Sequence, residues 1–458
     1  MKLKKITVSQ LFGTYTYTIP LWENEAVTIL HSPNGHGKTT ILKLVEAAME
    51  GNLVYLDETP FLYLSLTFDH GTVVEVRKKQ VFSSVLDQNF FQFRNLAVHG
   101  TKGQLALPFV YEIQEEDGDS TVYSVGLDRD VILALSRRMT QGRTRLDADV
   151  QSAPVSLKEI IAQEKLEDEI FETGELFIRL LRYKAACNIH MIEANRVLKS
   201  MFSGENQVSV ECVRLYSEEL GQMIASVKQK AGELAEKLDR TFPARVLEQI
   251  LKGNGAKSFD RKEIRMQLEQ LEQRRLELVQ AGLLEQDAGE MMQGLQWTAD
   301  QELSEDTCCF LSTYIQDNWE KLHCYTDLKK KLDILLDVIN IKNGFSNKQM
   351  KIQGQKGAVF FMNNGMPIPL EKLSSGEKND FILFYELIFK CNENSLILID
   401  EPEISLHIAW QQEFIRQLLR ICQINRMQAI VATHSPNIVD EYWNLLVDLD
   451  GEEGEEDV

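Results

Sequence analysis

The sequence predicts an α/β fold in which a mixed sheet is interrupted by an inserted α-helical, coiled-coil-like hairpin. Short runs of alternating apolar and polar residues between positions 3 and about 125 are typical of strands. Apolar residues then recur at helical spacing over residues 220–238 and again over 264–278, with a turn-rich segment between, which indicates two amphipathic helices that fold back on each other. From residue 350 onward, strand and helix patterns alternate again, so the α/β character returns.

The composition is that of an ordinary globular chain and excludes global disorder. Of 458 residues, 44% are apolar and 26% charged, which is enough for two or three domain-sized cores. The 49 basic and 69 acidic residues give a formal charge of −20, so DNA binding stays open only as a local basic patch. Seven cysteines without a CxxC pair argue against zinc and structural disulfides. With no secretory leader and no apolar run long enough for a membrane span, we expect a cytoplasmic protein without a membrane partner.

A glycine-rich loop lies between a strand pattern and a helix pattern near the N-terminus. Residues 32–40 read Ser-Pro-Asn-Gly-His-Gly-Lys-Thr-Thr, which matches the phosphate-binding loop G-x-x-x-x-G-K-[ST] except that Ser32 replaces the first glycine. The backbone N–H groups around the glycines would wrap a phosphate. Lys38 would reach the β and γ phosphates, and the Thr39 hydroxyl would hold Mg²⁺. The remaining predicted nucleotide-binding residues are Asn34, Gly35, His36, Gly37 and Thr40.

Two continuous apolar runs in the C-terminal third are typical of central parallel strands and end in polar residues. The run at 395–399 is followed by Asp400 and Glu401, and the run at 428–433 is followed by His434. Carboxylates at the carboxyl end of such strands lie where open α/β sheets bind ligands. We therefore expect Asp400 to coordinate Mg²⁺, Glu401 to activate the attacking water, and His434 to contact the γ-phosphate. A plain surface role for His434 is the alternative.

A serine-rich segment precedes the first of these strands and starts a predicted helix. It consists of Ser374, Ser375, Gly376 and Glu377 after Leu373. Ser374 with Glu377 three positions later also fits an ordinary helix-capping box, so this segment has both a structural and a functional interpretation.

The order of these motifs resembles the ATP-binding-cassette class of ATPases, on the branch of Rad50, SMC, RecF and OLD-type enzymes. Residues 398–407 followed by Ala-Thr-His-Ser-Pro at 432–436 resemble the AAA15-type standalone ATPases of bacterial anti-phage systems. The ATPase subunit of the PARIS system (AriA) is the closest in pattern, and the Septu ATPase (PtuA) is a near alternative. The resemblance covers roughly residues 1–200 and 340–445.

The resemblance implies that two copies pair head to tail and sandwich ATP. Each nucleotide would lie between the Lys38 loop of one copy and a trans signature, residues 374–377, of the other. The signature departs from the family's Leu-Ser-Gly-Gly-Gln at Ser375 and Glu377. Asn195, after the strand pattern at 189–194, is expected in place of the family's glutamine. The implied domains are an ATPase N-terminal lobe at 1–204, a helical insert at 205–340, an ATPase C-terminal lobe at 341–445 and an acidic tail at 446–458.

The expected function is that of an ATP-hydrolysing sensor and scaffold in anti-phage defence. The residues after Pro436 are too few for another domain, so we expect the nuclease effector, of the TOPRIM type, on a separate chain. The homo-oligomer would hold this effector and release or activate it on a viral trigger, such as a phage-encoded protein. A RecF- or Rad50-like DNA-binding ATPase in repair, or a Septu-type ATPase with an HNH nuclease, stays open as an alternative.

Overall fold

The computed structural model divides the chain into two compact units, which are described separately. Unit 1 comprises Met1–Ala194 and Cys391–Val458, and unit 2 comprises Asn195–Lys390. Residues 341–390 thus group with the helical insert, while the lobe boundaries given above stay a prediction. The structure describes residues 1–22, 25–78, 109–115, 120–125, 176, 179–180, 182–183, 186–194, 198–203, 206–251, 261–285, 304–343, 347–404, 406 and 408–449.

A five-stranded parallel sheet forms the centre of unit 1. Its strand order is β16-β3-β15-β14-β8, and every neighbouring pair is parallel. β14 and β15 are buried along their whole length, which explains why they read as continuous apolar runs. The strands are β3 (Val27–His31), β8 (Ile189–Ile192), β14 (Leu396–Asp400), β15 (Gln428–Thr433) and β16 (Leu446–Asp448).

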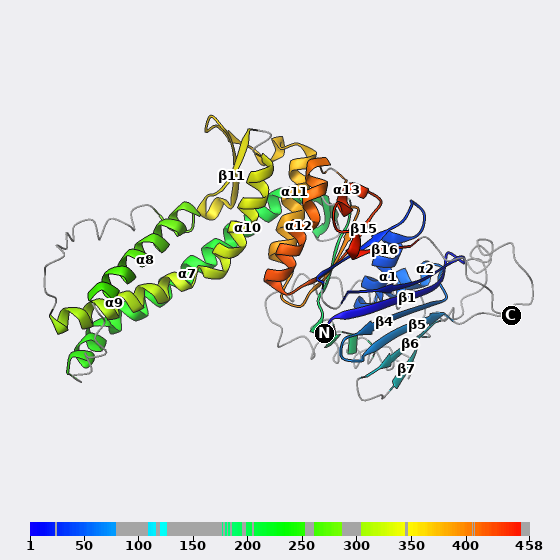
Figure 1. Cartoon of the computed structure of the whole chain (residues 1–458), viewed down its shortest axis with the longest axis horizontal. Coiled ribbons are helices and arrows are strands. Elements are labelled where there is room, and N and C mark those ends of the chain that lie inside the picture. The colour runs from blue at the N-terminus through cyan, green and yellow to red at the C-terminus, as the bar shows by residue number, and fades with distance from the viewer. Residues whose placement is uncertain are drawn as a thin grey trace, which may run out of the picture. The chain divides into compact units, whose positions relative to one another are not determined.

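A second, antiparallel sheet of six strands completes unit 1, in the order β2-β1-β4-β5-β6-β7 (Figure 1). Within β1, Ile6 and Val8 alternate with partly exposed neighbours and are fully buried, and the register with β4 shifts between Leu3 and Lys5, where Leu3 is buried as well. The predicted α/β fold is confirmed, with its parallel and antiparallel strands in two separate sheets. The strands are β1 (Leu3–Leu11), β2 (Tyr15–Pro20), β4 (Tyr63–Phe68), β5 (Val73–Lys78), β6 (Phe109–Gln114) and β7 (Ser120–Val125).

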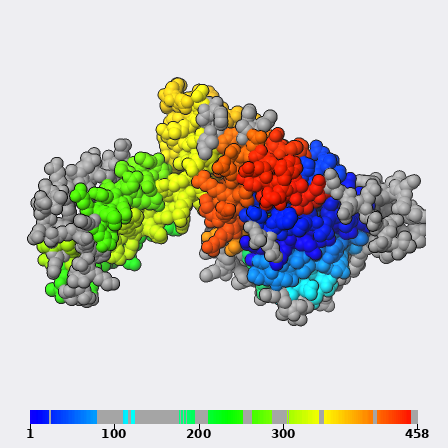
Figure 2. Space-filling model, in the orientation of Figure 1, coloured from blue at the N-terminus to red at the C-terminus, as the bar shows by residue number. Residues whose placement is uncertain are grey.

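Helix α1 contributes the largest helical share of the unit 1 core. Ile41, Leu42, Leu44 and Val45 on this helix are fully buried in one cluster with residues of both sheets. N-terminal residues (blue) and C-terminal residues (red) meet on one surface of unit 1 in Figure 2, as the pairing of β3 with β15 and β16 requires. The helices of this unit are α1 (Lys38–Glu50), α2 (Leu53–Glu58), α12 (Ile408–Asn425) and α13 (Pro436–Val439), with the 3₁₀ turn η6 (Trp443–Leu445).

Unit 2 contains the predicted helical insert, and a third helix lies between the two predicted ones. Helix α9 packs against both α7 and α8, so the fold-back is a three-helix arrangement (Figure 1). Ile264 and Leu268 of α8 form a cluster with Leu311 and Ile315 of α9. The 40 residues of α7 make it about 60 Å long. The bounds are α7 (Cys212–Leu251), α8 (Arg261–Gln280), α9 (Glu305–His323) and α10 (Thr326–Asn343).

The rest of unit 2 is a small β-subdomain and the helix that starts at the predicted signature. Three antiparallel strands pair in the order β11-β12-β13, and β9 pairs with β10. None of the helices in the described part of the chain is long and apolar enough to cross a membrane. The elements are β9 (Leu198–Ser203), β10 (Asn206–Glu211), β11 (Lys348–Ile352), η3 (Gly354–Lys356), β12 (Ala358–Met362), β13 (Pro367–Ile368), η4 (Leu370–Lys372), α11 (Ser375–Tyr385) and the π-helical turn η5 (Glu386–Lys390).

An ion pair between α7 and α9 should contribute measurably to the stability of the helical insert. Arg245 donates two hydrogen bonds of 2.6 Å to Asp317, whose side chain is only 4% exposed. Replacing Arg245 with Ala leaves this buried carboxylate unpaired and should lower the free energy of unfolding by about 2 kcal/mol. Urea-induced unfolding measures the loss. The control is Arg214→Ala on the same helix, where both partners of the ion pair are exposed and the loss should be much smaller. Equal losses for the two variants would contradict the prediction.

Candidate functional site

The carboxyl ends of three neighbouring parallel strands bring the predicted site residues of unit 1 together. In the register of the sheet, Asp400 pairs with Ala432, and Thr433 pairs with His31. The loops that follow β3, β14 and β15 therefore leave the sheet at the same edge. This is the edge at which parallel α/β sheets bind ligands.

Two glycines give the phosphate loop its shape. Gly35 has φ +94° and Gly37 has φ +84°, a left-handed conformation that favours glycine. A Cβ on Gly37 would also lie 2.7 Å from Leu11 Cδ2, so a side chain there would collide with β1. Ser32, which stands at the pattern's first glycine, is not among the residues with positive φ. Its side chain therefore brings no backbone strain, and the departure from the pattern is tolerated.

Lys38, the first residue of α1, is folded back onto the loop. Its ammonium group donates to the carbonyl oxygens of Ser32 at 2.5 Å and Pro33 at 3.1 Å, and to Ser32 Oγ at 3.3 Å. Burial lowers the pKa of Lys38, and the nearby carboxylates of Glu401, Glu403 and Asp400 oppose this shift. A phosphate bound in the loop would replace these acceptors with its own oxygens.

The two predicted Mg²⁺ ligands contact each other directly. Thr39 Oγ1 donates a hydrogen bond of 2.8 Å to Asp400 Oδ1. Burial raises the pKa of Asp400, the bond from Thr39 opposes this, and the charge of Glu401 adds to it. A hydroxyl and a carboxylate are hard oxygen ligands that suit Mg²⁺. Among the described residues, no group of three or more His, Cys, Asp or Glu side chains is placed to hold a metal ion.

Glu401, the predicted base, adopts a conformation that is uncommon for a residue with a side chain. Its φ is +43°, and its backbone N–H donates to the carbonyl of Ala432 at 2.9 Å. Such left-handed non-glycine residues cluster at functional sites, where the surrounding structure holds them in place. The neighbouring strand β15 supplies that support here. The role of Glu401 as the base stays a prediction.

His434 directly follows β15 and contacts a carboxylate to which the sequence motif gave no role. Glu403 Oε1 lies 3.1 Å from His434 Nδ1 and also accepts hydrogen bonds from the backbone N–H of His434 and from Thr433 Oγ1. Glu403 is 8% exposed. The only sequence signal for this contact was that Glu403 follows Asp400 by three residues. A γ-phosphate contact of His434 stays a prediction.

Two tyrosines on β2 also support the loop, and the sequence analysis missed both. The Tyr15 ring stacks on His36 with centroids 5.2 Å apart, and the Tyr17 hydroxyl donates to the His36 carbonyl at 3.1 Å. Asn34 and Gly35 are exposed at the tip of the loop, and Thr40 is half-buried in the first turn of α1. Asn195 lies outside the described residues.

The predicted signature lies in unit 2 and forms the N-terminus of α11. Ser374 Oγ accepts from the backbone N–H of Glu377, and Glu377 Oε2 accepts from the backbone N–H of Ser374, so the capping-box interpretation is confirmed. Lys348 also donates to both carboxylate oxygens of Glu377, at 2.7 and 2.8 Å. Ser374 and Ser375 are exposed, and Gly376 is half-exposed. Contact of these residues with a nucleotide of another copy stays a prediction.

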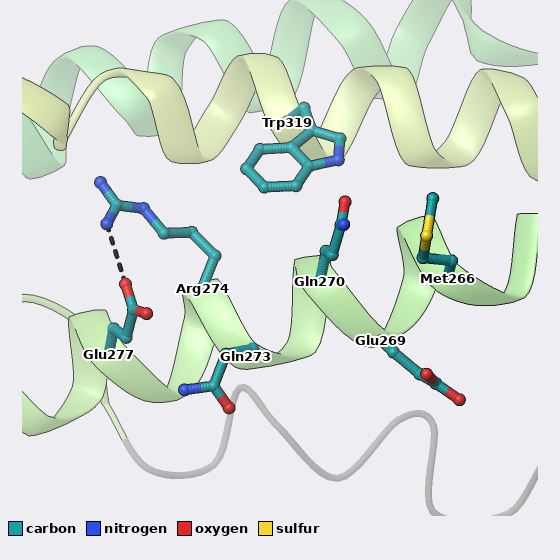
Figure 3. Close-up of a pocket in the computed structure, with 7 residues that line it drawn as sticks. All are labelled: Met266, Glu269, Gln270, Gln273, Arg274, Glu277 and Trp319. Carbon is teal, nitrogen blue, oxygen red and sulfur yellow. Dashed lines mark hydrogen bonds and ion pairs between the residues drawn. The ribbon is translucent and has the colours of Figure 1, made fainter. Parts of the chain in front are cut away.

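A shallow groove on unit 2 is a poor candidate for the nucleotide. Its cavity volume is about 480 Å³, and it lies between α8 and α9 beside Trp319 (Figure 3). The one cation that lines it, Arg274, pairs with Glu277 at 3.0 Å. No glycine-rich loop lines it. The glycine-rich loop with Lys38 lies in unit 1.

A family model described as AAA ATPase domain matches residues 1–439. Protein ea59 of Escherichia phage lambda is 32% identical over 93 residues, which are 20% of this chain and 18% of that protein. The Retron Ec83 probable ATPase of Escherichia coli is 31% identical over 132 residues, which are 26% of this chain and 24% of that protein. Each match therefore spans less than a quarter of the relative's own length.

Solved structures of SMC heads are similar at low identity. The Pyrococcus furiosus Smc head with an extended coiled coil, bound to the C-terminal domain of ScpA, is 12% identical with a TM-score of 0.34, covering 98% of this chain and 93% of that chain. The Thermotoga maritima SMC head is also 12% identical with a TM-score of 0.34, covering 98% and 94%. The fold described above rests on the strands and helices of this chain itself.

The ion pair at the predicted signature should make stability depend on pH. Burial tends to raise the pKa of Glu377, but the bonds from Lys348 and Ser374 outweigh it and hold the pKa below its usual value of 4.5. Stabilisation is therefore present above about pH 4.5 and is lost as the pH falls through the lower folded pKa. Replacing Glu377 with Gln should lower the free energy of unfolding by about 1–2 kcal/mol at pH 7 and by less below pH 4.

Urea unfolding at several pH values measures this difference. The exposed Glu371 of the preceding turn provides the control, and Glu371→Gln should change stability little at any pH. A loss for Glu377→Gln that is the same at pH 7 and pH 4 would show that the charge of Glu377 is not responsible.

Proposed function

Because this chain belongs to the AAA ATPase domain family, we propose that it binds ATP with Mg²⁺ and hydrolyses it to ADP and phosphate in unit 1. The observation that carries this proposal is the 2.8 Å bond between Thr39 and Asp400, since it joins the phosphate loop to the end of β14. The register of the parallel sheet brings these two residues together at its ligand-binding edge. An ATP·Mg²⁺ site requires this proximity, because both are ligands of the same ion.

Each residue of the site would have a separate task in hydrolysis. The loop N–H groups and Lys38 bind the β and γ phosphates and offset their charge. Thr39 and Asp400 would hold Mg²⁺, which would supply positive charge to offset the charge that develops on the phosphates. Glu401 accepts a proton from the attacking water, and His434 contacts the γ-phosphate. Loss of Glu401 would therefore lower the rate of hydrolysis more than it lowers the affinity for the nucleotide.

We further propose that two copies pair head to tail, with the signature of one copy on the nucleotide of the other. Ser374 and Ser375 are exposed at the N-terminus of α11, where backbone N–H groups and the helix dipole favour an anion. The carboxylate of Glu377 is engaged by Lys348 within its own chain. The contact across copies would therefore fall to Ser374, Ser375 and Gly376.

In the cell, we propose a sensor and scaffold role in anti-phage defence, in the cytoplasm. The homo-oligomer would hold a separate effector nuclease, of the TOPRIM type, and release or activate it on a phage-encoded trigger. The similarity to a retron ATPase supports a defence setting. Among defence ATPases, the motif pattern supports a similarity to the ATPase subunit of the PARIS system.

Two variants separate binding from hydrolysis. Lys38→Ala should weaken binding of Mg·ATP at least about 100-fold, because the phosphates lose their charged donor. Glu401→Gln should keep binding and lower kcat about 100-fold or more, because the water loses its base. Calorimetric titration measures binding, and steady-state phosphate release measures turnover. The control is Arg416→Ala, which removes an exposed side chain of α12. Unchanged turnover in Glu401→Gln would remove this residue as the base.

The assembly can be tested by the native mass of the tagged chain, co-expressed with its neighbouring genes and purified with ATP. A homo-oligomer that carries a stoichiometric second polypeptide with nuclease activity is the expected result. The same preparation from Glu401→Gln should keep this polypeptide if ATP binding alone holds the complex. A dimer that retains DNA and no second polypeptide would contradict the scaffold role and favour a repair-type ATPase.

A further inference from the structure

We propose that Glu403 is a positioning residue that orients the imidazole of His434 in the ATPase site. The inference rests on the proposed function, because it concerns how His434 contributes to hydrolysis. It goes further by assigning a task to a carboxylate that is neither the Mg²⁺ ligand nor the base. The evidence is the hydrogen bonding and burial of the two residues.

One oxygen of Glu403 fixes three groups around the end of β15. Oε1 accepts from Thr433 Oγ1 at 2.7 Å and from the backbone N–H of His434 at 3.1 Å, and it lies 3.1 Å from His434 Nδ1. These contacts hold both the backbone and the ring of His434. With Nδ1 directed at Glu403, Nε2 is the nitrogen left to meet a nucleotide.

The burial of the two side chains differs in the way that this role requires. The side chain of Glu403 is 7% exposed, whereas that of His434 is 44% exposed. The acidic partner is therefore fixed in the protein, while the ring is accessible to a ligand. A carboxylate that contacts one ring nitrogen of a histidine fixes the orientation of the ring and determines which nitrogen carries the proton, as in hydrolytic triads.

Retaining a buried carboxylate at this position is costly, which argues against a purely structural role. The second oxygen of Glu403, Oε2, is buried and has no hydrogen-bond partner among the described residues. A buried polar atom without a hydrogen-bond partner destabilises the folded state. A neutral side chain could accept the bonds from Thr433 and the backbone without a full charge. The charge suits a residue that faces an imidazole.

Helix α12 holds the segment that carries Glu403 against the loop after β15. Gln411 Nε2 donates to the Leu406 carbonyl at 3.1 Å, and Ser435 Oγ donates to Gln411 Oε1 at 2.8 Å. One amide therefore joins the two loops on either side of the Glu403–His434 contact. This support keeps the carboxylate and the ring at a fixed separation.

A double-mutant cycle on kcat tests the inference in the full-length chain. Glu403→Ala should lower kcat about 10- to 100-fold, a typical cost for the loss of a residue that orients a functional histidine. The KM for Mg·ATP and nucleotide binding should change much less, because the phosphate loop is intact. Glu403→Gln should recover part of the loss, since an amide oxygen can accept the same bonds. The double variant Glu403→Ala/His434→Ala should be no slower than His434→Ala alone.

The outcomes separate this inference from the proposed function. Losses that multiply in the double variant, or a Glu403→Ala variant with unchanged kcat, would overturn the positioning role while leaving the ATPase intact. A wild-type chain without ATP turnover would instead overturn the proposed function. Glu413→Ala, on the partly exposed surface of α12, is the matched control, and nucleotide binding by each variant shows that the loop has folded.

Discussion

The site depends on the register of one parallel sheet. Thr39 and Asp400 are 361 positions apart in the sequence, yet they lie within hydrogen-bonding distance because β3, β15 and β14 are adjacent and end at the same edge. A slip of β14 by one residue would turn Asp400 to the opposite face of the sheet. The full burial of β14 and β15 makes such a slip costly, because both faces are packed. The core thus fixes the position of the ligands.

Three charged side chains are nearly buried at this edge, so their charges need compensating partners. Lys38, Asp400 and Glu403 are between 5% and 8% exposed. Taking an ion out of water costs several kcal/mol unless other charges compensate it. Here the nearby carboxylates oppose the effect of burial on the pKa of Lys38, and the bond from Thr39 and the charge of Lys43 do the same for Asp400. A phosphate bound in the loop would exchange partners with Lys38, whose ammonium group contacts the carbonyls of Ser32 and Pro33.

The sequence predicted the groups that come from local patterns, but not the contacts between distant side chains. The phosphate loop, Asp400 and the capping box of Ser374 follow from residue type and spacing, and the structure has all three. Periodicity identified α7 and α8, but it shows only which face is apolar. It could not show that α9 would pack between them. The Glu403–His434 contact likewise joins residues 31 positions apart through a register that no local pattern specifies.

The two departures of the signature from the family's pattern both have local physical reasons. Ser375 is the first residue of α11, a helical position where a side chain causes no strain and a glycine is not required. Either Glu or Gln at position 377 could complete the capping box with Ser374. Only Glu, however, supplies the charge that pairs with Lys348 on β11. The change to Glu377 therefore ties α11 to the β-subdomain of unit 2, while the same carboxylate still caps the backbone N–H of Ser374 at the start of the helix.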